Sequence, residues 1–334
     1  MKQSILCLTL GCLLVCSLIP APVLPAGAGT AAAPNHPPKT ALTLRLMLDW
    51  FPNVDHLPVY VAQETGYFTE QGIQVEIISP SETADALKLA AIGNVDLAVS
   101  YQPQTIIAAD QGLALKVIAP LVRHPLTTLL FLADAGIGHP RDLSGKKIGY
   151  TVPGLMDVLL HAFASINKIQ DYTPVNVGFT ILPALVSGRV DAVMGPFKTY
   201  ETVGMARHGY AAAFFELEKW GIPDYEELIF VCSPAVLDKK QDAVKGFVLA
   251  LEKAFEHVAA YPEKSLALYL GAVPQADKKI ETEAFALTRP YFARTLGHDP
   301  DKWQAFADFA LEHGLIKTRV DAAGLIHSWQ SPRK

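Results

Sequence analysis

Cysteine is scarce in this sequence, and its distribution excludes a disulfide framework. Three of the four cysteines, Cys7, Cys12 and Cys16, lie in an apolar segment at the start of the chain. Removal of that segment, which its pattern predicts, leaves Cys232 without a partner for an internal disulfide. Stability must therefore come from the burial of apolar side chains in a core.

The sequence also lacks a strong excess of either charge. It carries 28 Lys and Arg residues against 33 Asp and Glu residues, so nothing in its charge indicates a nucleic-acid partner. Half of the residues are hydrophobic, and about 300 residues after the leader are enough for two domains of ordinary size. The composition favours a globular protein with a substantial core.

The start of the chain has the pattern of a secretory signal peptide. Lys2 precedes an apolar run at residues 5–19, and small residues at 26–28 follow it. The run is shorter than the roughly 20 apolar residues that span a bilayer core. The pattern therefore predicts export rather than membrane insertion.

We expect residues 1–28 to be removed as the signal peptide and residues 29–41, rich in Ala and Pro, to form a flexible lead-in. A lipid-anchored variant on Cys12 or Cys16 stays open as an alternative. The residues that precede both cysteines match a lipidation site poorly. Folding is expected to begin near residue 42.

Motifs of common enzyme classes are missing. The Gly-Lys-Lys at residues 145–147 lacks both the upstream Gly, replaced by Pro140, and the following Ser or Thr of a phosphate-binding loop. The sequence has no Gly-x-Ser-x-Gly elbow, no His-Glu-x-x-His spacing and no dinucleotide-binding fingerprint. We therefore predict no catalytic residue, no metal site and no cofactor.

An internal repeat is the strongest indication of architecture. Residues 87–99 return in similar form as residues 182–194. Each copy has the pattern of a short helix, a Gly that ends it, a turn that contains Asp, and a fully apolar strand. The repeat predicts two α/β lobes, each with one copy; a single large doubly wound domain is the alternative.

Strands and helices alternate around both copies of the repeat. A helix at 57–65 before a strand at 74–78 resembles a helix at 155–167 before a strand at 174–179. This alternation predicts parallel sheets with helices on both faces. Further apolar runs predict strands at residues 42–48, 95–99, 147–150 and 190–194.

We expect residues 42–130 and 231–334 to form lobe 1 and residues 131–230 to form lobe 2. A helix at 241–260 and another that begins after a capping Asp299 should pack back on lobe 1. The chain should cross between the lobes near residues 126–132 and 228–233. Two extended crossings are typical of a hinge.

The residues after each predicted strand are the candidates for a binding site, because ligands of open α/β sheets bind beyond the carboxyl ends of the strands. Trp50 and Tyr101 are placed to stack on a flat ring, while Asp49 or Glu201 accepts hydrogen bonds from ring amines. The competing interpretation is that Trp50 and its neighbour Phe51 only cover the core.

A weaker signal follows the strand at 147–150. Residues 152–154 open a helix and offer free backbone N–H groups, which suit an anion or a carbonyl oxygen. Loops of this kind are common, so this stretch alone does not define a ligand.

At these strand ends the sequence resembles the type II periplasmic binding proteins of the thiamine-biosynthesis, alkanesulfonate and nitrate group, which feed ABC transporters. The resemblance covers nearly the whole chain after the signal peptide. It rests on residues 48–56, 66–73, 100–103, 142–150 and 221–228.

Two stretches, residues 48–53 and 100–103, are more specific. Together with residues 175–179 and 197–201 they look like the branch that binds pyrimidine precursors of thiamine, such as formylaminopyrimidine or hydroxymethylpyrimidine. The sequence departs from that branch at residues 196–200, where Pro follows Gly195 and Lys-Thr-Tyr replaces Arg-Asn-Phe.

The resemblance implies a two-lobed type II periplasmic binding fold with parallel or mixed sheets, flanking helices and a two-strand hinge. It implies a periplasmic, monomeric, non-catalytic protein that takes a small pyrimidine ligand and delivers it to an ABC transporter permease. The ligand-binding residues that it implies are Asp49, Trp50, Asn53, His56, Tyr101, Gln102, Pro153, Gly154, Phe197, Glu201 and Tyr225.

Three alternatives stay open. A binding protein for alkanesulfonates or another small anion should have basic pocket loops, which Asp49 and Glu201 argue against. A eukaryotic pyrimidine synthase of the same family sacrifices a His in a turn like that of His56 and uses iron and a cysteine-rich cluster. Here only Cys232 remains, more typical of a small core residue, and His56 is interpreted as a turn or pocket-lining residue. A sensor would need further domains.

Overall fold

The structure, a computed structural model, describes residues 41–329. The signal peptide at 1–28, the lipidation candidates Cys12 and Cys16 and all but the last residue of the lead-in lie outside the described residues. Among residues 41–329, no helix combines the length and the apolar character that crossing a membrane requires.

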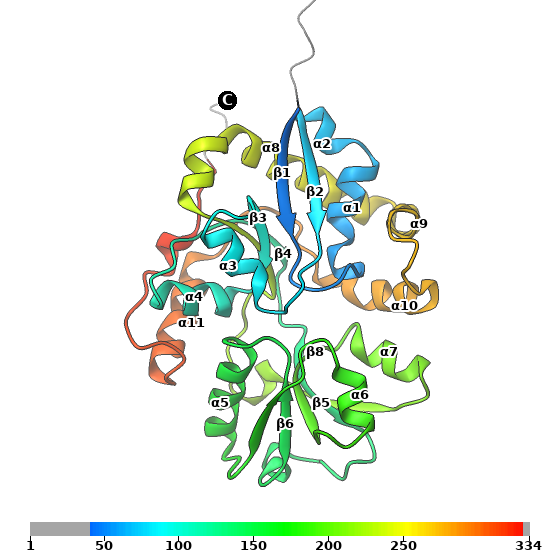
Figure 1. Cartoon of the computed structure of the whole chain (residues 1–334), viewed down its shortest axis with the longest axis vertical. Helices are drawn as coiled ribbons and strands as arrows, with labels where there is room; N and C mark the ends of the chain where they lie inside the picture. The colour runs from blue at the N-terminus through cyan, green and yellow to red at the C-terminus, as the bar shows by residue number, and fades with distance from the viewer. Residues whose placement is uncertain (1–40, 330–334) are drawn as a thin grey trace, which may run out of the picture. The chain divides into compact units, whose positions relative to one another are not determined.

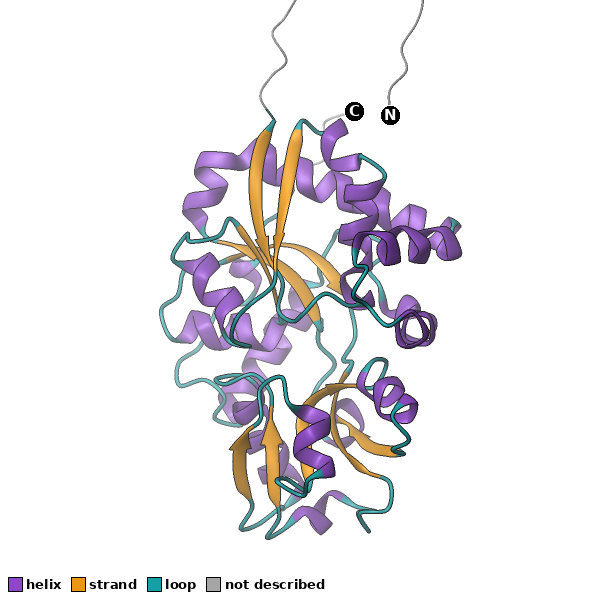
Figure 2. Cartoon of the chain, turned by 45° about the vertical axis from the view of Figure 1, so that its right-hand side comes forward, coloured by secondary structure: helices purple, strands orange, loops and turns teal. Residues whose placement is uncertain are grey.

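The described strands form two five-stranded mixed sheets (Figures 1 and 2). In the first sheet, β1 pairs in parallel with β2 and β3, and β10 pairs antiparallel with β3 and β4. The strands of this sheet, in spatial order, are β2 (Ile73–Ile78), β1 (Leu42–Met47), β3 (Leu97–Ser100), β10 (Leu228–Cys232) and β4 (Lys116–Val122).

The second sheet repeats this plan. β6 pairs in parallel with β7 and β8, and β5 pairs antiparallel with β8 and β9. In each sheet the antiparallel strand is the first one formed after the chain arrives from the other sheet. The strands, in spatial order, are β7 (Thr173–Asn176), β6 (Lys147–Tyr150), β8 (Ala192–Phe197), β5 (Thr127–Leu132) and β9 (Ala212–Glu216).

The sequence repeat corresponds to one helix–strand unit in each sheet: α3 (Asp85–Ala91) with β3, and α6 (Ile181–Val186) with β8. In each unit an aspartate just before the new strand ties it to the parallel strand beside it, β1 in the first sheet and β6 in the second. Asp96 Oδ2 accepts from the backbone N–H of Arg45 at 2.9 Å, and Asp191 Oδ2 accepts from that of Lys147 at 2.8 Å. The repeated aspartates therefore set the pairing of β3 with β1 and of β8 with β6.

The remaining helices pack around the two sheets. The N-terminal and middle helices are α1 (Leu57–Glu64), α2 (Tyr67–Glu70), α4 (Gln102–Asp110), α5 (Met156–Asn167) and α7 (Glu201–Arg207). The C-terminal helices are α8 (Pro234–Ala260), α9 (Pro262–Ala272), α10 (Lys278–Thr288) and α11 (Pro300–Glu312). Short 3-10 turns are η1 (Val54–His56), η2 (Pro140–Leu143), η3 (Leu217–Trp220), η4 (Arg289–Tyr291) and η5 (Ala323–Leu325).

The C-terminal helices pack back on the first sheet, as the sequence predicts. Phe247 of α8 lies parallel to Phe68 of α2, with ring centroids 5.5 Å apart, and meets Phe230 of β10 edge-on at 5.0 Å. The predicted cap of α11 is present, because Asp299 accepts from the backbone N–H of Asp301 at 3.1 Å. Helices α9 and α10 were not predicted.

The chain passes between the sheets through residues 123–126 and 217–227, just before β5 and β10. A fully buried carboxylate joins the two passages. Glu227 Oε2 accepts from the backbone N–H of Thr127 at 2.7 Å, and Oε1 accepts from the Thr127 hydroxyl at 2.8 Å. We propose that the two sheets mark the two lobes. Because β5 (residues 127–132) lies in the second sheet and β10 (residues 228–232) in the first, the boundaries then fall a few residues before the expected positions 130 and 230.

The aspartate ties lead to a stability prediction. Asp96→Ala removes a charged acceptor from a strand N–H and is expected to lower the free energy of unfolding by about 1–3 kcal/mol. Asp191→Ala should cost less, because the Asp191 side chain is 43% exposed against 13% for Asp96. Urea denaturation measures both, with Asp242→Ala on the exposed face of α8 as the control. Equal losses in all three variants would contradict this role.

Candidate ligand-binding site

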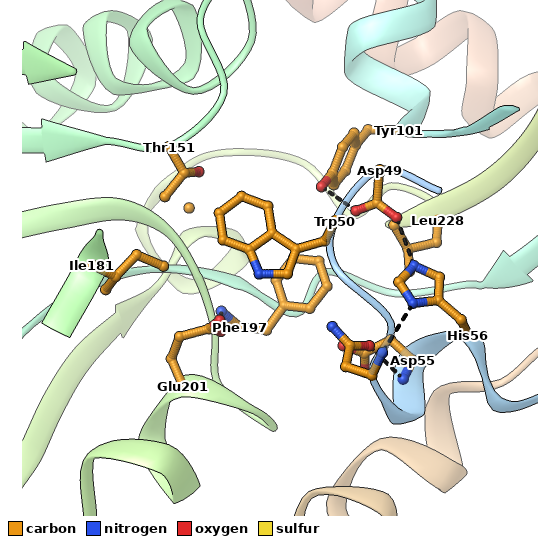
Figure 3. A pocket seen from close by; sticks show the side chains of 12 residues that line it. Asp49, Trp50, Asp55, His56, Tyr101, Thr151, Ile181, Phe197, Glu201 and Leu228 are labelled. Carbon is orange, nitrogen blue, oxygen red and sulfur yellow. Dashed lines mark hydrogen bonds and ion pairs between the residues drawn. The ribbon is translucent and has the colours of Figure 1, made fainter. Parts of the chain in front are cut away.

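A cavity of about 360 Å³, a volume that includes space open to solvent, lies where strand ends of the two sheets meet (Figure 3). Its walls come from the segments after β1, β3 and β6, from the first residues of α6, α7 and β10, and from β8. The lining residues are Asp49, Trp50, Asn53, Asp55, His56, Tyr101, Thr151, Ile181, Gly195, Phe197, Glu201 and Leu228.

Asp49 is the centre of a buried hydrogen-bond network. One carboxylate oxygen accepts from the Tyr101 hydroxyl at 2.6 Å, and the other lies 2.8 Å from His56 Nε2. The second ring nitrogen, Nδ1, accepts from the backbone N–H of Asn53 at 3.4 Å. A neutral imidazole with Nδ1 as acceptor carries its proton on Nε2, so His56 donates to Asp49. The network fixes the segments after β1 and β3 against each other.

The turn that carries these residues is a reciprocal cap. The Asn53 side chain accepts from the backbone N–H of Asp55 at 2.9 Å, while His56 caps Asn53 in return. Pro58 then stands in the first turn of α1, where no backbone N–H is needed. The local sequence therefore orients Asp55 and His56 before any ligand is present.

Glu201 enters the cavity from the first residue of α7. Its Oε2 accepts from the backbone N–H of Phe197 at 2.6 Å, which leaves the second carboxyl oxygen for a ligand. Burial raises the pKa of Glu201 to about 7, against the effect of this hydrogen bond, and the charge of Asp49 raises it further.

Asp55 is a fully buried carboxyl group that also lines the cavity. Its Oδ1 accepts from the Thr288 hydroxyl of α10 at 3.0 Å, and its Oδ2 has no partner among the described residues. Burial is the main reason that the pKa of Asp55 is raised to about 8; the charges of Glu201 and Asp49 also raise it, whereas His56 lowers it. These effects together favour the protonated form of Asp55 near neutral pH.

Aromatic rings from both sheets meet at the cavity. Trp50 lies 4.5 Å from Phe179 and 5.5 Å from Phe51, measured between ring centroids, and its Nε1 has no partner in the described chain. Trp50 packs on the apolar cluster of the second sheet that includes Ile181, whereas Phe51 is 40% exposed and does not cover the core. Stacking of a ligand between Trp50 and Tyr101 stays a prediction.

The structure brings seven of the eleven expected residues to the cavity and places four elsewhere. Gln102 and Tyr225 line a separate cavity beside the two passages, where Gln102 Oε1 accepts from the backbone N–H of Glu226 at 2.8 Å. Pro153 and Gly154 lie in the turn before α5. The N–H of Gly154 donates to Asp157 Oδ1 at 2.7 Å, so it is not free for an anion.

Five lining residues did not appear in the expected set: Asp55, Thr151, Ile181, Gly195 and Leu228. Asp55 lies in the same strand-end segment as Asp49, so the same argument could have included it. Gly195 has a positive φ of 125° and faces the Thr151 side chain, which leaves no room for a Cβ atom. Ile181 and Leu228 are apolar walls without a chemical signature.

The cysteine-rich cluster that the resemblance implies for the pyrimidine synthase has no counterpart among residues 41–329, where Cys232 is the free cysteine. Within residues 41–329, no group of three or more His, Cys, Asp and Glu side chains is placed to bind a metal ion. Cys232 is fully buried in β10, and burial raises its pKa to about 12, as for a core residue.

Solved structures of the same fold support the assignment of class. The chain superposes on the alkanesulfonate-binding protein of Xanthomonas axonopodis pv. citri with a TM-score of 0.69, at 16% identity, over 85% of this chain and 98% of that one. A Candida albicans protein described as having the generic periplasmic binding protein fold gives a TM-score of 0.66, at 16% identity, over 84% and 93%. The fold is that of the periplasmic binding proteins, as the sequence predicts.

Sequence comparison identifies the family. Residues 53–265 match the family model described as NMT1/THI5 like. A protein from Haemophilus influenzae whose name refers to thiamine biosynthesis is 36% identical over 82% of this chain and 88% of its own length. The formylaminopyrimidine-binding protein of Halalkalibacterium halodurans is 29% identical over 84% and 88%. The chain belongs to the NMT1/THI5-like family.

The same family contains an enzyme. A 4-amino-5-hydroxymethyl-2-methylpyrimidine phosphate synthase of Saccharomyces cerevisiae is 27% identical over 82% of this chain and 84% of its own length. The relatives of this chain therefore include both binding proteins and synthases. The side chains of the cavity are the evidence that distinguishes the two functions.

The raised pKa values of the cavity predict how stability depends on pH. Asp55 and Glu201, with folded-state pKa values of about 8 and about 7, keep protons that the unfolded chain releases near its ordinary, lower values. The unfolded state then binds fewer protons, so the free energy of unfolding should fall as pH rises from about 5 to about 8.

Chemical denaturation at several pH values measures this slope, and Asp55→Asn should reduce it because the amide does not titrate. Glu256→Asn, on an exposed position of α8, is the control. Stability that is constant or rises over this interval would contradict the prediction.

Proposed function

We propose that this protein is the solute-binding component of an ABC importer and that it captures an aminopyrimidine precursor of thiamine in the cavity between its sheets. The observation that carries the proposal is the carboxyl-rich lining of that cavity. Three carboxyl groups, Asp49, Asp55 and Glu201, line it, and among residues 41–329 the only basic lining residue is His56, which already bonds to Asp49.

Basic residues of the nearby helices are engaged elsewhere. Lys198 bonds to Glu216 at 3.0 Å and to Glu218 at 2.9 Å, and Arg207 pairs with Glu283. Among the described residues, the cavity lining therefore offers no lysine or arginine to a sulfonate or nitrate ion. An anion is bound by hydrogen-bond donors and positive charge, whereas this cavity supplies mainly carboxyl acceptors. The lining therefore favours a ligand that donates hydrogen bonds, such as an amine-bearing ring.

Aromatic and apolar walls suit a flat ring. Trp50, Tyr101 and Phe197 line the same cavity as the carboxyl groups. The formylaminopyrimidine-binding relative supports this class of ligand.

Contacts across the cavity support capture by closure of two lobes. The Tyr200 hydroxyl before α7 donates to Glu281 of α10 at 2.9 Å, and the Thr83 hydroxyl donates to the backbone carbonyl of Thr151 at 2.6 Å. These hydrogen bonds join parts of the chain assigned to different lobes. Opening would break them and expose Trp50 to solvent.

Binding without catalysis is the version of the proposal that the side chains favour over a synthase, since His56 is held on both ring nitrogens and the described part of the chain has no cysteine besides Cys232. The predicted signal peptide at residues 1–28 supports export to the periplasm, and there an ABC permease is the expected partner.

A ligand screen by thermal shift and calorimetry tests the proposal. We expect 4-amino-5-hydroxymethyl-2-methylpyrimidine or formylaminopyrimidine to raise the melting temperature and to bind at a single site. An analogue with an oxo group in place of the amino group should bind more weakly, and alkanesulfonates and nitrate should not bind. If no pyrimidine binds and a sulfonate does, the proposed ligand class is wrong.

The second test replaces a single acceptor. Glu201→Gln should weaken the aminopyrimidine complex by about 1–3 kcal/mol, because one carboxyl acceptor becomes an amide that also presents donors. Glu256→Gln on the exposed face of α8 is the matched control and should leave the affinity unchanged. Unchanged affinity in Glu201→Gln would remove this residue from the site.

A further inference from the structure

One carboxyl oxygen in the cavity is buried and unused. Asp55 is fully buried, and Thr288 occupies only its Oδ1. Oδ2 has no hydrogen-bond partner among residues 41–329, although Asp55 lines the cavity. A buried polar atom without a partner is costly to keep, so a group that projects into a binding cavity is a candidate for ligand contact.

The surroundings of Asp55 decide its protonation state. The titratable groups that act on it are Asp49 after β1, His56 in the same turn, Glu201 and Tyr200 at α7, and Tyr269 of α9. Glu281 of α10 lies close by, since its Oε2 accepts from the N–H of Val54 at 2.9 Å. None of these groups is a lysine or an arginine, and an ionised Asp55 would stand beside other carboxyl groups with one oxygen unsolvated.

We propose that Asp55 contacts the ligand as a neutral carboxylic acid, donating its O–H to an unprotonated ring nitrogen while Glu201 accepts from the neighbouring exocyclic amine. This inference rests on the proposed function, since it names the atoms that recognise the aminopyrimidine. No bond to hydrogen breaks in this step: Asp55 keeps its proton, and the hydrogen bond replaces one from water to the ring.

The pairing also explains the choice of ring edge. An amine beside an unprotonated ring nitrogen offers one donor and one acceptor, and Glu201 with a protonated Asp55 offers one acceptor and one donor. Replacement of the amine by an oxo group moves the ring proton and reverses both roles. The cavity would then meet two mismatched hydrogen bonds.

The raised pKa values support a bell-shaped dependence of affinity on pH. Glu201 becomes a stronger acceptor when it loses its proton, which occurs near pH 7, and Asp55 must keep its proton to donate, which it does up to about pH 8. The two groups interact, so the observed limits belong to the pair. Affinity should fall on the alkaline side as Asp55 ionises.

The experiment measures the affinity for 4-amino-5-hydroxymethyl-2-methylpyrimidine from about pH 6 to about pH 10 in the full chain and its variants. Asp55→Asn keeps a donor, the amide N–H, and keeps an acceptor for Thr288. It should bind within about threefold of the wild type at pH 7 and lose the alkaline decline. Asp55→Leu has a similar shape without a donor and should bind about tenfold or more weakly.

A purely structural role of Asp55, as the partner of Thr288, predicts a different pattern. Thr288→Val removes that hydrogen bond and leaves the Asp55 carboxyl group in the cavity, so we expect wild-type affinity at pH 7. If Thr288→Val weakens binding as much as Asp55→Leu does, the role is structural and the inference fails. Melting temperatures of all variants confirm that each is folded.

Failure of the inference and failure of the proposed function give different results. A wild type that binds no pyrimidine at any pH overturns both. A wild type that binds the pyrimidine equally well up to about pH 10, or an Asp55→Asn variant as weak as Asp55→Leu, overturns only the donor role of Asp55.

Discussion

Glu227 is a fully buried carboxyl group whose hydrogen bonds join the two passages of the chain between its sheets. Glu227, the last residue before β10, bonds to Leu126 and Thr127 at the start of β5. β5 belongs to the second sheet and β10 to the first, so this contact holds the two sheets next to each other at the passages. Burial raises the pKa of Glu227 to about 7, and three hydrogen bonds from Leu126 and Thr127 oppose that effect. The cavity depends on this contact, since its walls come from both sheets.

Much of the fold follows from the sequence because the repeat carries its own hydrogen bonds. Asp96 and Asp191, one in each copy of the repeat, accept a hydrogen bond from a backbone N–H of the neighbouring strand. The motif therefore defines a helix, a turn and the pairing of the new strand with that neighbour. The direction of β5 and β10 could not be derived in this way. Both are buried and largely apolar, and such a strand has the same pattern in parallel and antiparallel pairing. The orientation is set by where the chain comes from, which is a tertiary property.

Helix α9 shows a second limit of the sequence. Pro262 correctly marks the end of α8, but a proline is also favoured in the first turn of a new helix, and α9 begins at that residue. A single residue, Tyr261, separates the two helices. The same residue type is evidence for a stop and for a start, so the sequence alone could not separate a loop from α9.

The sequence predicts which segments form the site, but not which of their side chains enter it. The ends of parallel strands converge, which brought Asp49, Tyr101 and Phe197 together as expected. The rule does not give the direction of the next side chain, and Gln102, one residue beyond Tyr101, turns to the backbone of Glu226 instead. Position along the chain therefore identified the segments, and only the hydrogen bonds of the folded chain identified which side chains enter the cavity.

The carboxyl groups of the cavity are hard to explain by stability alone. Burying Asp55 and Glu201 near Asp49 without a lysine or arginine costs free energy, as the raised pKa values of Asp55 and Glu201 indicate. Apolar side chains of similar size would fill the same space at lower cost. Groups that violate the rules of core packing are expected at functional sites, where a ligand supplies the missing partners. The ligand that completes this cavity must then offer donors where Glu201 accepts, and it must also satisfy the free atoms of Asp55 and Trp50, Oδ2 and Nε1. Asp49 and an ionised Glu201 repel an anion, whereas a ring with both an amine and bare nitrogens can meet Glu201, Asp55 and Trp50 at once.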